Sequence, residues 1–474
     1  NANGSLPQPA DNFINLTIGG DATSTNNFSL KGNFVNNGTF ESTISDNTIT
    51  FNGTSAQEIS GSGISAFKKL ILNNSSGLTF SSTNINVYQL IESTLGTFTN
   101  NSSNVVLKSD VNDAAGMLKV SNSSNYNGNI TVERFFNSNS NDFRMVGSPI
   151  EDTRLSDWQH STLSNGFLYC GFGGSNYTWS GCGDFCSVYF YNESQASDDD
   201  PTLGYDSATN ITNFVTPAKG TIIYSSSGSK KLSVTGSPEL DDFNVQISKG
   251  SIDSDRGWNM VSNPYPCTID WSLFRAFNTG IDNANWIYSG DAGNFIQSTN
   301  NIPHSQGFWV KKTLQGTSNL SFKLNHTVSS ETNFTRSNNG VNLPLKLELS
   351  GGVNSYRDYA SIFASQNFTN DYDLGDDIFK FMSPIPDFAP NIYFYDNQGN
   401  KLDKTCINNN LSQDLFFDTR ISQYAQGNYK IEFNNLSTFM IGSCILVEDL
   451  HTGIFTDLRQ DSVINFISDT LAPN

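Results

Sequence analysis

The stretch Val35–Phe40 (VNNGTF) sets out the pattern that decides the fold of the first part of the chain: an apolar residue, a polar corner rich in Asn and Gly, and a phenylalanine. The pattern returns at 72–80 (LNNSSGLTF), 37 residues further on, and again 19 residues later at 91–98 (IESTLGTF). The FNGT of 51–54 lies near the skipped copy, so the period is about 19 residues. Short strands at this spacing predict stacked rungs, a right-handed β-helix-like solenoid over residues 1–125. The alternative is an ordinary β-meander with hairpins.

The composition of the repeat also predicts how corners and rungs hold together. The chain contains 60 Asn and 38 Gly, and both residue types tolerate the left-handed backbone angles of tight corners. Ladders of Asn and Ser along stacked strands would add hydrogen bonds without requiring charge.

After residue 125 the sequence predicts an antiparallel, jelly-roll-like β-sandwich over residues 126–328. Short apolar segments lie between clusters of turn residues, with expected strands at Ile130–Phe136, 220–224 and 306–310, and an aromatic strand followed by a proline turn within 257–266. One helix of at most two turns is expected at Asp270–Phe277. Five tryptophans lie in strand-like segments and are expected in the core: Trp158, Trp258, Trp271, Trp286 and Trp309.

A polar stretch at 329–340 indicates a linker to a second, smaller, Ig-like sandwich over residues 341–474. This region opens with an alternation of leucines that predicts a half-buried strand, Leu343, Leu345, Leu347 and Leu349. Further strands are expected at 391–395, 429–433 and 441–447. The predicted fold class is therefore all-β: a short N-terminal β-solenoid followed by two antiparallel β-sandwiches.

The charge balance argues against several partners. The chain has 45 acidic and 26 basic residues, a net charge of −19. Its basic doublets, at 68–69, 230–231 and 311–312, are too few and too scattered to neutralise phosphates. We therefore expect no nucleic-acid partner and no binding to anionic membranes. No apolar run approaches the roughly 18 residues of a membrane span.

Other features indicate an exported protein. The first residues, Asn1–Ser5, lack a charged region, an apolar core and an initiator Met, so we interpret them as a mature N-terminus from which a targeting peptide has been removed. An even number of cysteines, six, suits an oxidising compartment. The expected location is extracellular.

Three groups of motifs resemble a known class of protein. They are VERF at 132–135 with FRMVGSP at 143–149; GWNMVSNPYPCTIDW at 257–271 with QGFWV at 306–310; and YDLGDDIFK at 372–380 with GNYKI at 427–431 and LVEDL at 446–450. Together they resemble the large, adhesin-like surface proteins exported by the bacterial type IX secretion system, upstream of their cleaved sorting domain. The resemblance implies a bacterial cell surface, contact with the secretion machinery during export and a multi-domain β architecture. It supplies no catalytic residue.

The chain departs from that family at its end. A further strand would be expected directly after Asn474, so the last sandwich is expected to lack its last strand. An open sheet edge invites strand addition by another molecule.

The cysteines are candidates for disulfides: Cys170, Cys182, Cys186, Cys267, Cys406 and Cys444. We favour Cys406–Cys444 within the last domain and two bonds among the other four, although six cysteines allow 15 pairings. A zinc site formed by Cys182, Cys186 and His160 is the alternative.

Two acidic clusters are candidate calcium sites because carboxylates supply the hard oxygen ligands that Ca²⁺ prefers. The first is Asp371, Asp373, Asp376 and Asp377, whose spacing is not that of an EF-hand. The second is 198–200 (DDD). The competing interpretation of both is a solvated acidic surface.

One loop carries a candidate ligand-binding patch. Its aromatic residues crowd the Cys-rich segment and suit glycan stacking or protein contact: Tyr169, Phe172, Tyr177 and Trp179. Three Asp-Ser/Thr-apolar triplets, at 206–208, 461–463 and 469–471, are candidate O-glycan acceptors in the setting that the resemblance implies.

No catalytic constellation is evident. The four histidines lie in no Gly-x-Ser-x-Gly or His-Glu-x-x-His context, and the solenoid acids Glu41, Asp46, Glu58 and Glu92 do not recur at one rung position, as a polysaccharide-cleaving groove would require. We therefore expect a non-enzymatic extracellular protein, an adhesin or a fibre subunit, that associates with itself or with another surface protein. The alternatives are a glycan-binding module and a polysaccharide-active enzyme.

Overall fold

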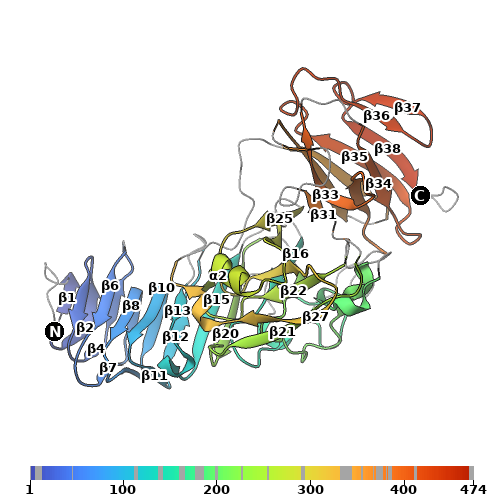
Figure 1. The fold of residues 1–474 in the computed structure, drawn as a ribbon. Coiled ribbons are helices and arrows are strands. Elements are labelled where there is room, and N and C mark those ends of the chain that lie inside the picture. The colour runs from blue at the N-terminus through green and yellow to red at the C-terminus, as the bar shows by residue number, and fades with distance from the viewer. Residues whose placement is uncertain are drawn as a thin grey trace.

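The computed structural model describes residues 2–5, 13–44, 46–110, 116–136, 142–159, 166–176, 186–197, 201–225, 228–252, 256–289, 294–330, 344–353, 356–366, 368–369, 377–380, 382, 387–409 and 414–468. The chain is all-β, with 54% strand and 6% helix, which confirms the predicted fold class. A solenoid of about five turns is followed by several antiparallel sheets (Figure 1). In the described part of the chain, no helix has the length and apolarity to cross a membrane.

The solenoid strands are short and follow one another at nearly regular intervals. They are β1 (Ala2–Ser5), β2 (Leu16–Thr23), β3 (Phe28–Leu30), β4 (Phe34–Asn36), β5 (Thr39–Ser42), β6 (Thr48–Phe51), β7 (Gln57–Ser60), β8 (Ile64–Asn73), β9 (Leu78–Ser81), β10 (Asn84–Leu95), β11 (Phe98–Asn101), β12 (Asn104–Leu107), β13 (Met117–Lys119) and β14 (Tyr126–Asn127).

Parallel ladders join each solenoid turn to the next. Along one ladder the paired residues are Thr39, Ile64, Asn84 and Asn104, spaced 25, 20 and 20 residues apart. A second ladder runs through β4, β7, β9, β11 and β14, and a third through β3, β6, β8, β10 and β13. The predicted stacking of rungs is confirmed, although the steps along this ladder are longer than the expected period.

The phenylalanines of the repeat fill the interior of the solenoid. Phe34, Phe40 and Phe67 are fully buried, and their ring centroids lie 5.2–6.1 Å apart. Further along, Phe80 stacks on Phe98 at 5.6 Å. Phe34 and Phe40 belong to one turn and Phe67 to the next, and Phe80 and Phe98 lie in two later successive turns. Rings of neighbouring turns therefore pack against one another inside the solenoid and form an aromatic column.

The corners differ from the sequence interpretation in one respect. Gly77 and Gly96 adopt the expected positive φ, but Asn435 is the only asparagine that does so in the described residues. The solenoid asparagines act by hydrogen bonding instead. The buried Asn36 amide donates to the Ile64 carbonyl at 2.9 Å, and the Asn74 amide donates to Ser55 and Gln57 of the preceding turn. They satisfy polar groups that a buried corner would otherwise leave unpaired.

The middle region is built from antiparallel sheets and two short α-helices. Its elements are β15 (Ile130–Phe136), β16 (Asp142–Val146), α1 (Leu155–Trp158), β17 (Val188–Tyr191), β18 (Tyr205–Ser207), β19 (Thr221–Ser225), β20 (Lys230–Gly236), β21 (Phe243–Lys249), β22 (Trp258–Ser262), β23 (Thr268–Ile269), α2 (Trp271–Phe277), β24 (Asn285–Ser289), β25 (Asn294–Ser298), β26 (Gly307–Lys311), β27 (Gly316–Phe322) and β28 (Thr327–Val328). The predicted helix is α2, which Asp270 caps by accepting the Leu273 N–H. The sequence did not predict α1.

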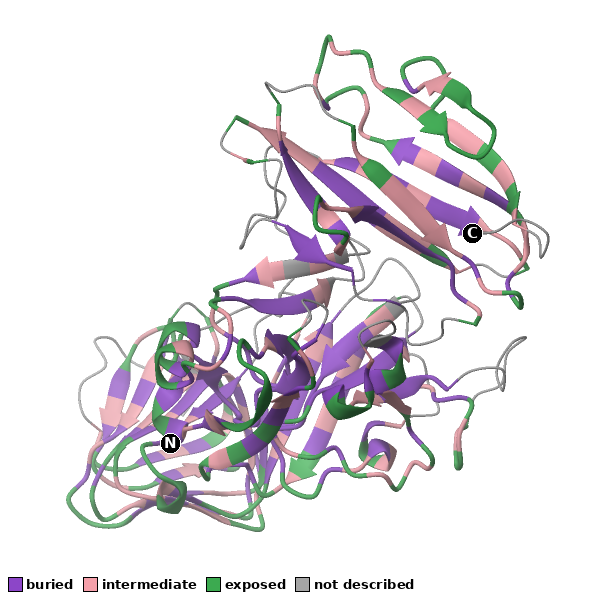
Figure 2. Ribbon diagram, turned by 45° about the vertical axis from the view of Figure 1, so that its right-hand side comes forward, coloured by how far each residue is buried: buried purple, intermediate pink, exposed green. Residues whose placement is uncertain are grey.

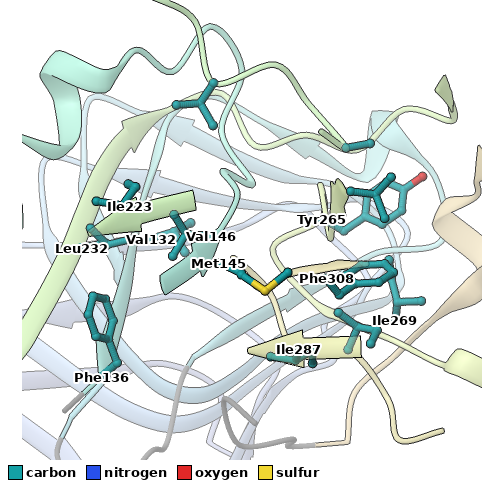
Figure 3. Close-up of a cluster of buried hydrophobic side chains, with 14 of the residues drawn as sticks. Val132, Phe136, Met145, Val146, Ile223, Leu232, Tyr265, Ile269, Ile287 and Phe308 are labelled. Atoms are coloured by element: carbon teal, nitrogen blue, oxygen red, sulfur yellow. The ribbon is translucent and has the colours of Figure 1, made fainter. Parts of the chain in front are cut away.

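The core of the middle region joins several sheets (Figure 3). Val132 and Phe136 of β15 and Leu232 of β20 lie on one side of it, and Ile287 of β24 and Phe308 of β26 on the other. All five tryptophans that were expected in the core are at most 4% exposed.

The solenoid passes into the middle region without a break in hydrogen bonding. β12 pairs in parallel with β15, which pairs antiparallel with β20, so one sheet of 16 strands crosses the expected boundary at residue 125. Lys119 Nζ also donates to the Thr327 carbonyl at 2.7 Å, across 208 residues of sequence. The Leu118 N–H donates to the Pro266 carbonyl at 2.7 Å. These contacts fix the last solenoid turn against the middle region.

The C-terminal region forms a second sheet system, far from the solenoid (Figure 1). Its strands are β29 (Leu345–Gly351), β30 (Arg357–Ser365), β31 (Ile378–Phe379), β32 (Asn391–Tyr395), β33 (Lys401–Asn408), β34 (Phe416–Arg420), β35 (Gly427–Asn434), β36 (Leu446–Asp449), β37 (Ile454–Asp457) and β38 (Val463–Ser468). The main sheet has the order β34-β32-β33-β30-β29-β35-β38, and β36 and β37 form a separate hairpin.

The leucine alternation at the start of this region is confirmed where it is described. Leu345, Leu347 and Leu349 are at most 2% exposed on β29, whereas Leu343 and most of the expected linker lie outside the described residues. The strand expected at 441–447 begins only at Leu446. Residues 441–445 instead form the turn that leads into the hairpin.

Candidate functional site

One aromatic residue of the patch that the sequence suggested, Tyr169, is not at the surface. Tyr169 is fully buried, with its ring stacked on Phe167 at 6.2 Å and 5.5 Å from Phe172. Burial raises the pKa of the Tyr169 phenol well above its ordinary value. Tyr169 is therefore a core residue. A cluster of aromatic residues in the sequence suits burial as well as it suits ligand binding, so the pattern alone did not distinguish the two. Tyr177 and Trp179 lie outside the described residues.

One residue of the first acidic cluster, Asp377, has a structural role inside the C-terminal region. Asp377 is 2% exposed, and its carboxylate accepts the backbone N–H of Cys406 at 2.6 Å. It therefore anchors β33 and does not face outward as a calcium ligand. Asp371, Asp373 and Asp376, and the second cluster at 198–200, lie outside the described residues. In the part of the chain that the structure covers, no three His, Cys, Asp or Glu side chains gather closely enough to hold a metal.

No disulfide joins two of the described cysteines. Cys406 is buried in β33 while Cys444 is exposed before β36, so the favoured Cys406–Cys444 bond is not formed. Cys186 and Cys267 keep buried thiols that donate to the carbonyls of Val188 and Val328. Burial raises the pKa of both thiols, to about 12 for Cys267. Cys182, and His160 of the alternative zinc site, lie outside the described residues.

Of the remaining residues singled out in the sequence, the described histidines are divided between core and surface. His304 and His326 are buried, and burial lowers the pKa of each, well below the ordinary value for His304. His451 is exposed in the β36–β37 turn. Ser207 and Ser462, the acceptors of two candidate glycan triplets, are exposed, and Thr470 lies outside the described residues.

A buried ionic cluster, which the sequence did not reveal, lies where the C-terminal region meets the middle region. The Lys380 side chain is 1% exposed, and its Nζ lies 2.7 Å from Asp358 and 2.8 Å from Asp403. The other oxygen of Asp403 accepts the Phe295 N–H of β25, in the middle region, at 3.4 Å. Burial alone lowers the pKa of Lys380, but the two carboxylates outweigh it and the pKa is raised. We call these three residues the Lys380 triad.

Aromatic contacts surround the Lys380 triad and complete the joint. Phe379 packs edge-on against Trp258 of β22 at 6.1 Å, and Lys311 Nζ lies 3.6 Å above the Phe379 ring. The Tyr205 hydroxyl donates to the Met382 carbonyl at 3.4 Å. Because an ammonium over an aromatic face gains more when partly desolvated, these contacts favour a fixed docking of the two regions.

A second buried acid has a measurable consequence for stability. Glu239 is 5% exposed, and burial, followed by Glu151, Asp241 and Asp152, raises its pKa to about 7. Its pKa in the unfolded chain is near 4.5. The folded state therefore binds a proton that the unfolded state releases between these values, and stability falls as pH rises from 4.5 to 7.

We expect this group to remove about 2 kcal/mol of stability across that window, after discounting for solvent screening. Glu239→Gln should reduce the pH dependence of the free energy of unfolding, because the Gln side chain does not titrate. Urea unfolding of both proteins between pH 4.5 and 8 measures the difference. Glu448→Gln, an exposed glutamate, is the matched control. If the free energy of unfolding changed with pH equally in the wild type and in Glu239→Gln, Glu239 would not be the group responsible.

The last strand of the main C-terminal sheet forms an unusual edge. β38 pairs with β35 on one side, and no strand among the described residues pairs with its other side. Ile464 and Phe466 face the core, with the Phe466 ring stacked on Tyr429 at 5.8 Å, but remain half-buried. Ile467 points the opposite way and is 69% exposed. Figure 2 shows half-buried and exposed residues along this edge, beside strands with regularly buried residues.

The β36–β37 hairpin next to β38 adds more exposed apolar surface. Exposed apolar side chains of the hairpin and its approach are Ile441, Leu446, Leu450, Ile454 and Phe455, each at least 55% exposed. The Arg459 guanidinium fixes the base of the hairpin by donating to the carbonyls of Leu436, Phe439, Met440 and Ser443. We call β38 and this hairpin the C-terminal edge.

The two outer strands of this sheet differ in charge. β34, at the opposite edge, carries Asp418 and Arg420, which is how many proteins protect an edge strand from unwanted pairing. Residues 462–468 (SVINFIS) contain no charge, no Pro and no Gly. Sequences of this kind at a sheet edge readily pair with another strand. The C-terminal edge is therefore the candidate functional surface. Comparison with known proteins gives no further guide, because no family model, no curated protein and no solved structure matches the chain.

Proposed function

We propose that this chain is a non-enzymatic protein of a bacterial cell surface, a structural subunit or adhesin that acts as a stiff arm and joins other molecules through β-strand contacts. The resemblance of its motifs to proteins exported by the type IX system motivates the extracellular setting. The proposed partners are further copies of the chain or another surface protein.

One observation carries the proposal: hydrogen bonding continues from the solenoid into the middle region. Parallel pairing of β12 with β15 joins the last solenoid turns to the middle region through backbone hydrogen bonds. A solenoid gains stability from each neighbouring turn and forms an extended body. Anchoring its last turn through Lys119 and Leu118 makes the solenoid and the middle region one stiff unit.

The joint at the other end of the middle region supports the same function. The Lys380 triad and the Phe379 contacts hold the C-terminal sandwich at a defined position, so the C-terminal edge is presented at a fixed distance from the solenoid (Figure 1). An arm that ends in an exposed, uncharged strand, β38, suits assembly better than it suits catalysis.

Electron microscopy of the purified chain at several concentrations, with and without calcium, tests the proposal. We expect elongated single particles of constant shape when dilute, and joined particles or fibres when concentrated. Added salt should promote joining, because it screens the repulsion between copies that each carry a charge of −19. Dispersed single particles at every concentration and salt would contradict the subunit role. Particles whose two ends vary in relative orientation would contradict the stiff arm.

A further inference from the structure

We infer that two copies of this chain join by antiparallel pairing of β38 with β38, about a two-fold axis that lies midway between the two Asn465 residues. This inference rests on the proposed function, and it names both the contact and the partner. The paired strands would extend the main sheet of one C-terminal sandwich directly into that of the other.

The state of β38 supports a further strand beside it. In an edge strand, every second backbone N–H and C=O points away from the sheet. The core-facing Ile464 and Phe466 stay half-buried, whereas Tyr429 and Ile431, their partners on β35, are at most 4% exposed. A neighbouring strand would cover these side chains and pair the backbone groups at once.

The distribution of charge favours β38 of a second copy of the chain as the neighbouring strand. Two molecules of charge −19 repel each other over most of their surfaces. Residues 462–468 are uncharged, so within this segment no like charges would face one another, and the flanking Asp461 and Asp469 would meet only at the two ends of the contact. The β34 edge lacks this property because it carries Asp418 and Arg420.

The sequence of β38 is also self-complementary in one register. Residues opposite each other in an antiparallel pair lie on the same face of the sheet, so a two-fold axis must pass through a residue and not between two. An axis at Asn465 places Ile464 opposite Phe466 on the core side and Val463 opposite Ile467 on the outer side. The two Asn465 amides then meet at the centre. Apolar side chains thus face apolar ones on either side of the central Asn465 pair, and such cross-strand pairs stabilise sheets.

Cross-linking tests this register directly. Directly opposed residues have Cα atoms about 4.5–5.5 Å apart, within the range that a disulfide spans. In a background with the exposed Cys444 changed to Ser, Asn465→Cys should give a covalent dimer under mild oxidation. Asn428→Cys is the matched control, because Asn428 is exposed on β35 opposite Ile467. Its two copies would be separated by three strand spacings, about 14 Å, and would also be displaced along the strands, so they should not cross-link.

Sedimentation equilibrium of the full chain supplies a second readout. Ile467→Lys should weaken self-association at least tenfold, because an edge lysine prevents strand pairing. Ile252→Lys alters an even more exposed isoleucine of the middle region, 87% exposed, and should leave association unchanged.

The possible results distinguish a failure of the β38 contact from a failure of the proposed function. Association that survives Ile467→Lys, with no Asn465 cross-link, overturns the β38 contact but leaves a subunit role through another surface. A chain that stays monomeric at all concentrations, with no cross-link, overturns both. Loss of association in Ile467→Lys, with the cross-link confined to Asn465→Cys, establishes the contact.

Discussion

Replacing Lys380 with Met is expected to destabilise the C-terminal sandwich by about 3–5 kcal/mol, the usual result of removing one partner from a buried ionic group. Asp358 and Asp403 would be left facing each other with no cation between them, at a site where the Lys380 side chain is 1% exposed. The loss should be greatest above neutral pH. Burial already raises the pKa of Asp403, and without the lysine this carboxyl will take up a proton on acidification, which relieves the repulsion.

Hydrogen exchange followed by mass spectrometry on peptides from β29, β30 and β33 measures the effect. Tryptophan fluorescence does not report directly on these strands, because none of the six tryptophans lies beyond residue 309. Lys430→Met removes an exposed pair with Glu432 and should cost less than about 1 kcal/mol. Adding Asp403→Asn to Lys380→Met should restore part of the loss. Equal protection in Lys380→Met and Lys430→Met would show that the Lys380 triad does not support the joint.

The second large effect is expected in the solenoid, where Phe67→Ala should cost about 3–5 kcal/mol. The Phe67 ring is fully buried and lies 5.6 Å from Phe40 and 6.1 Å from Phe34, both in the turn before it. A cavity at this point breaks the aromatic column. Because each turn is stabilised mainly by its neighbours, protection from hydrogen exchange should fall in β5 and β10 as well as in β8.

Ile64→Ala is the control for Phe67→Ala on the same strand. Ile64 is 50% exposed, so its truncation leaves no closed cavity and should change stability by less than about 1 kcal/mol. Comparable losses for both variants would mean that the aromatic column is not what holds the turns together. A loss confined to β8 would mean that the turns unfold independently.

Prediction from the sequence succeeded where a residue pattern reports on its own immediate surroundings. The spacing of VNNGTF-like stretches predicted the solenoid, since each turn repeats the same local environment. Ile130–Phe136 and Asn391–Tyr395 were predicted at the bounds that β15 and β32 have. Asp270, an N-cap residue before an apolar run, marked the start of α2.

Prediction failed where a residue's role depends on partners far along the chain. Tyr169 was expected at a surface, yet Phe167, Phe172 and the core enclose it. Asp377 was expected to face solvent, yet it accepts an N–H from Cys406, 29 residues away. The Lys380 triad was not foreseen, because Lys380 meets Asp358 and Asp403 only when β30, β31 and β33 assemble.

The sequence by itself determined the all-β class, the stacked turns and most strand positions, because periodicity and turn residues act over a few neighbouring residues. The tertiary structure alone decided which charges are buried together, that the solenoid sheet continues through β12 into β15, and that an uncharged strand lies at a sheet edge. The SVINFIS segment would have the same composition in the middle of a sheet or at its border. The topology of the chain determines which strands lie beside this segment. Those strands determine whether its apolar side chains are buried in a core or remain partly exposed at an edge.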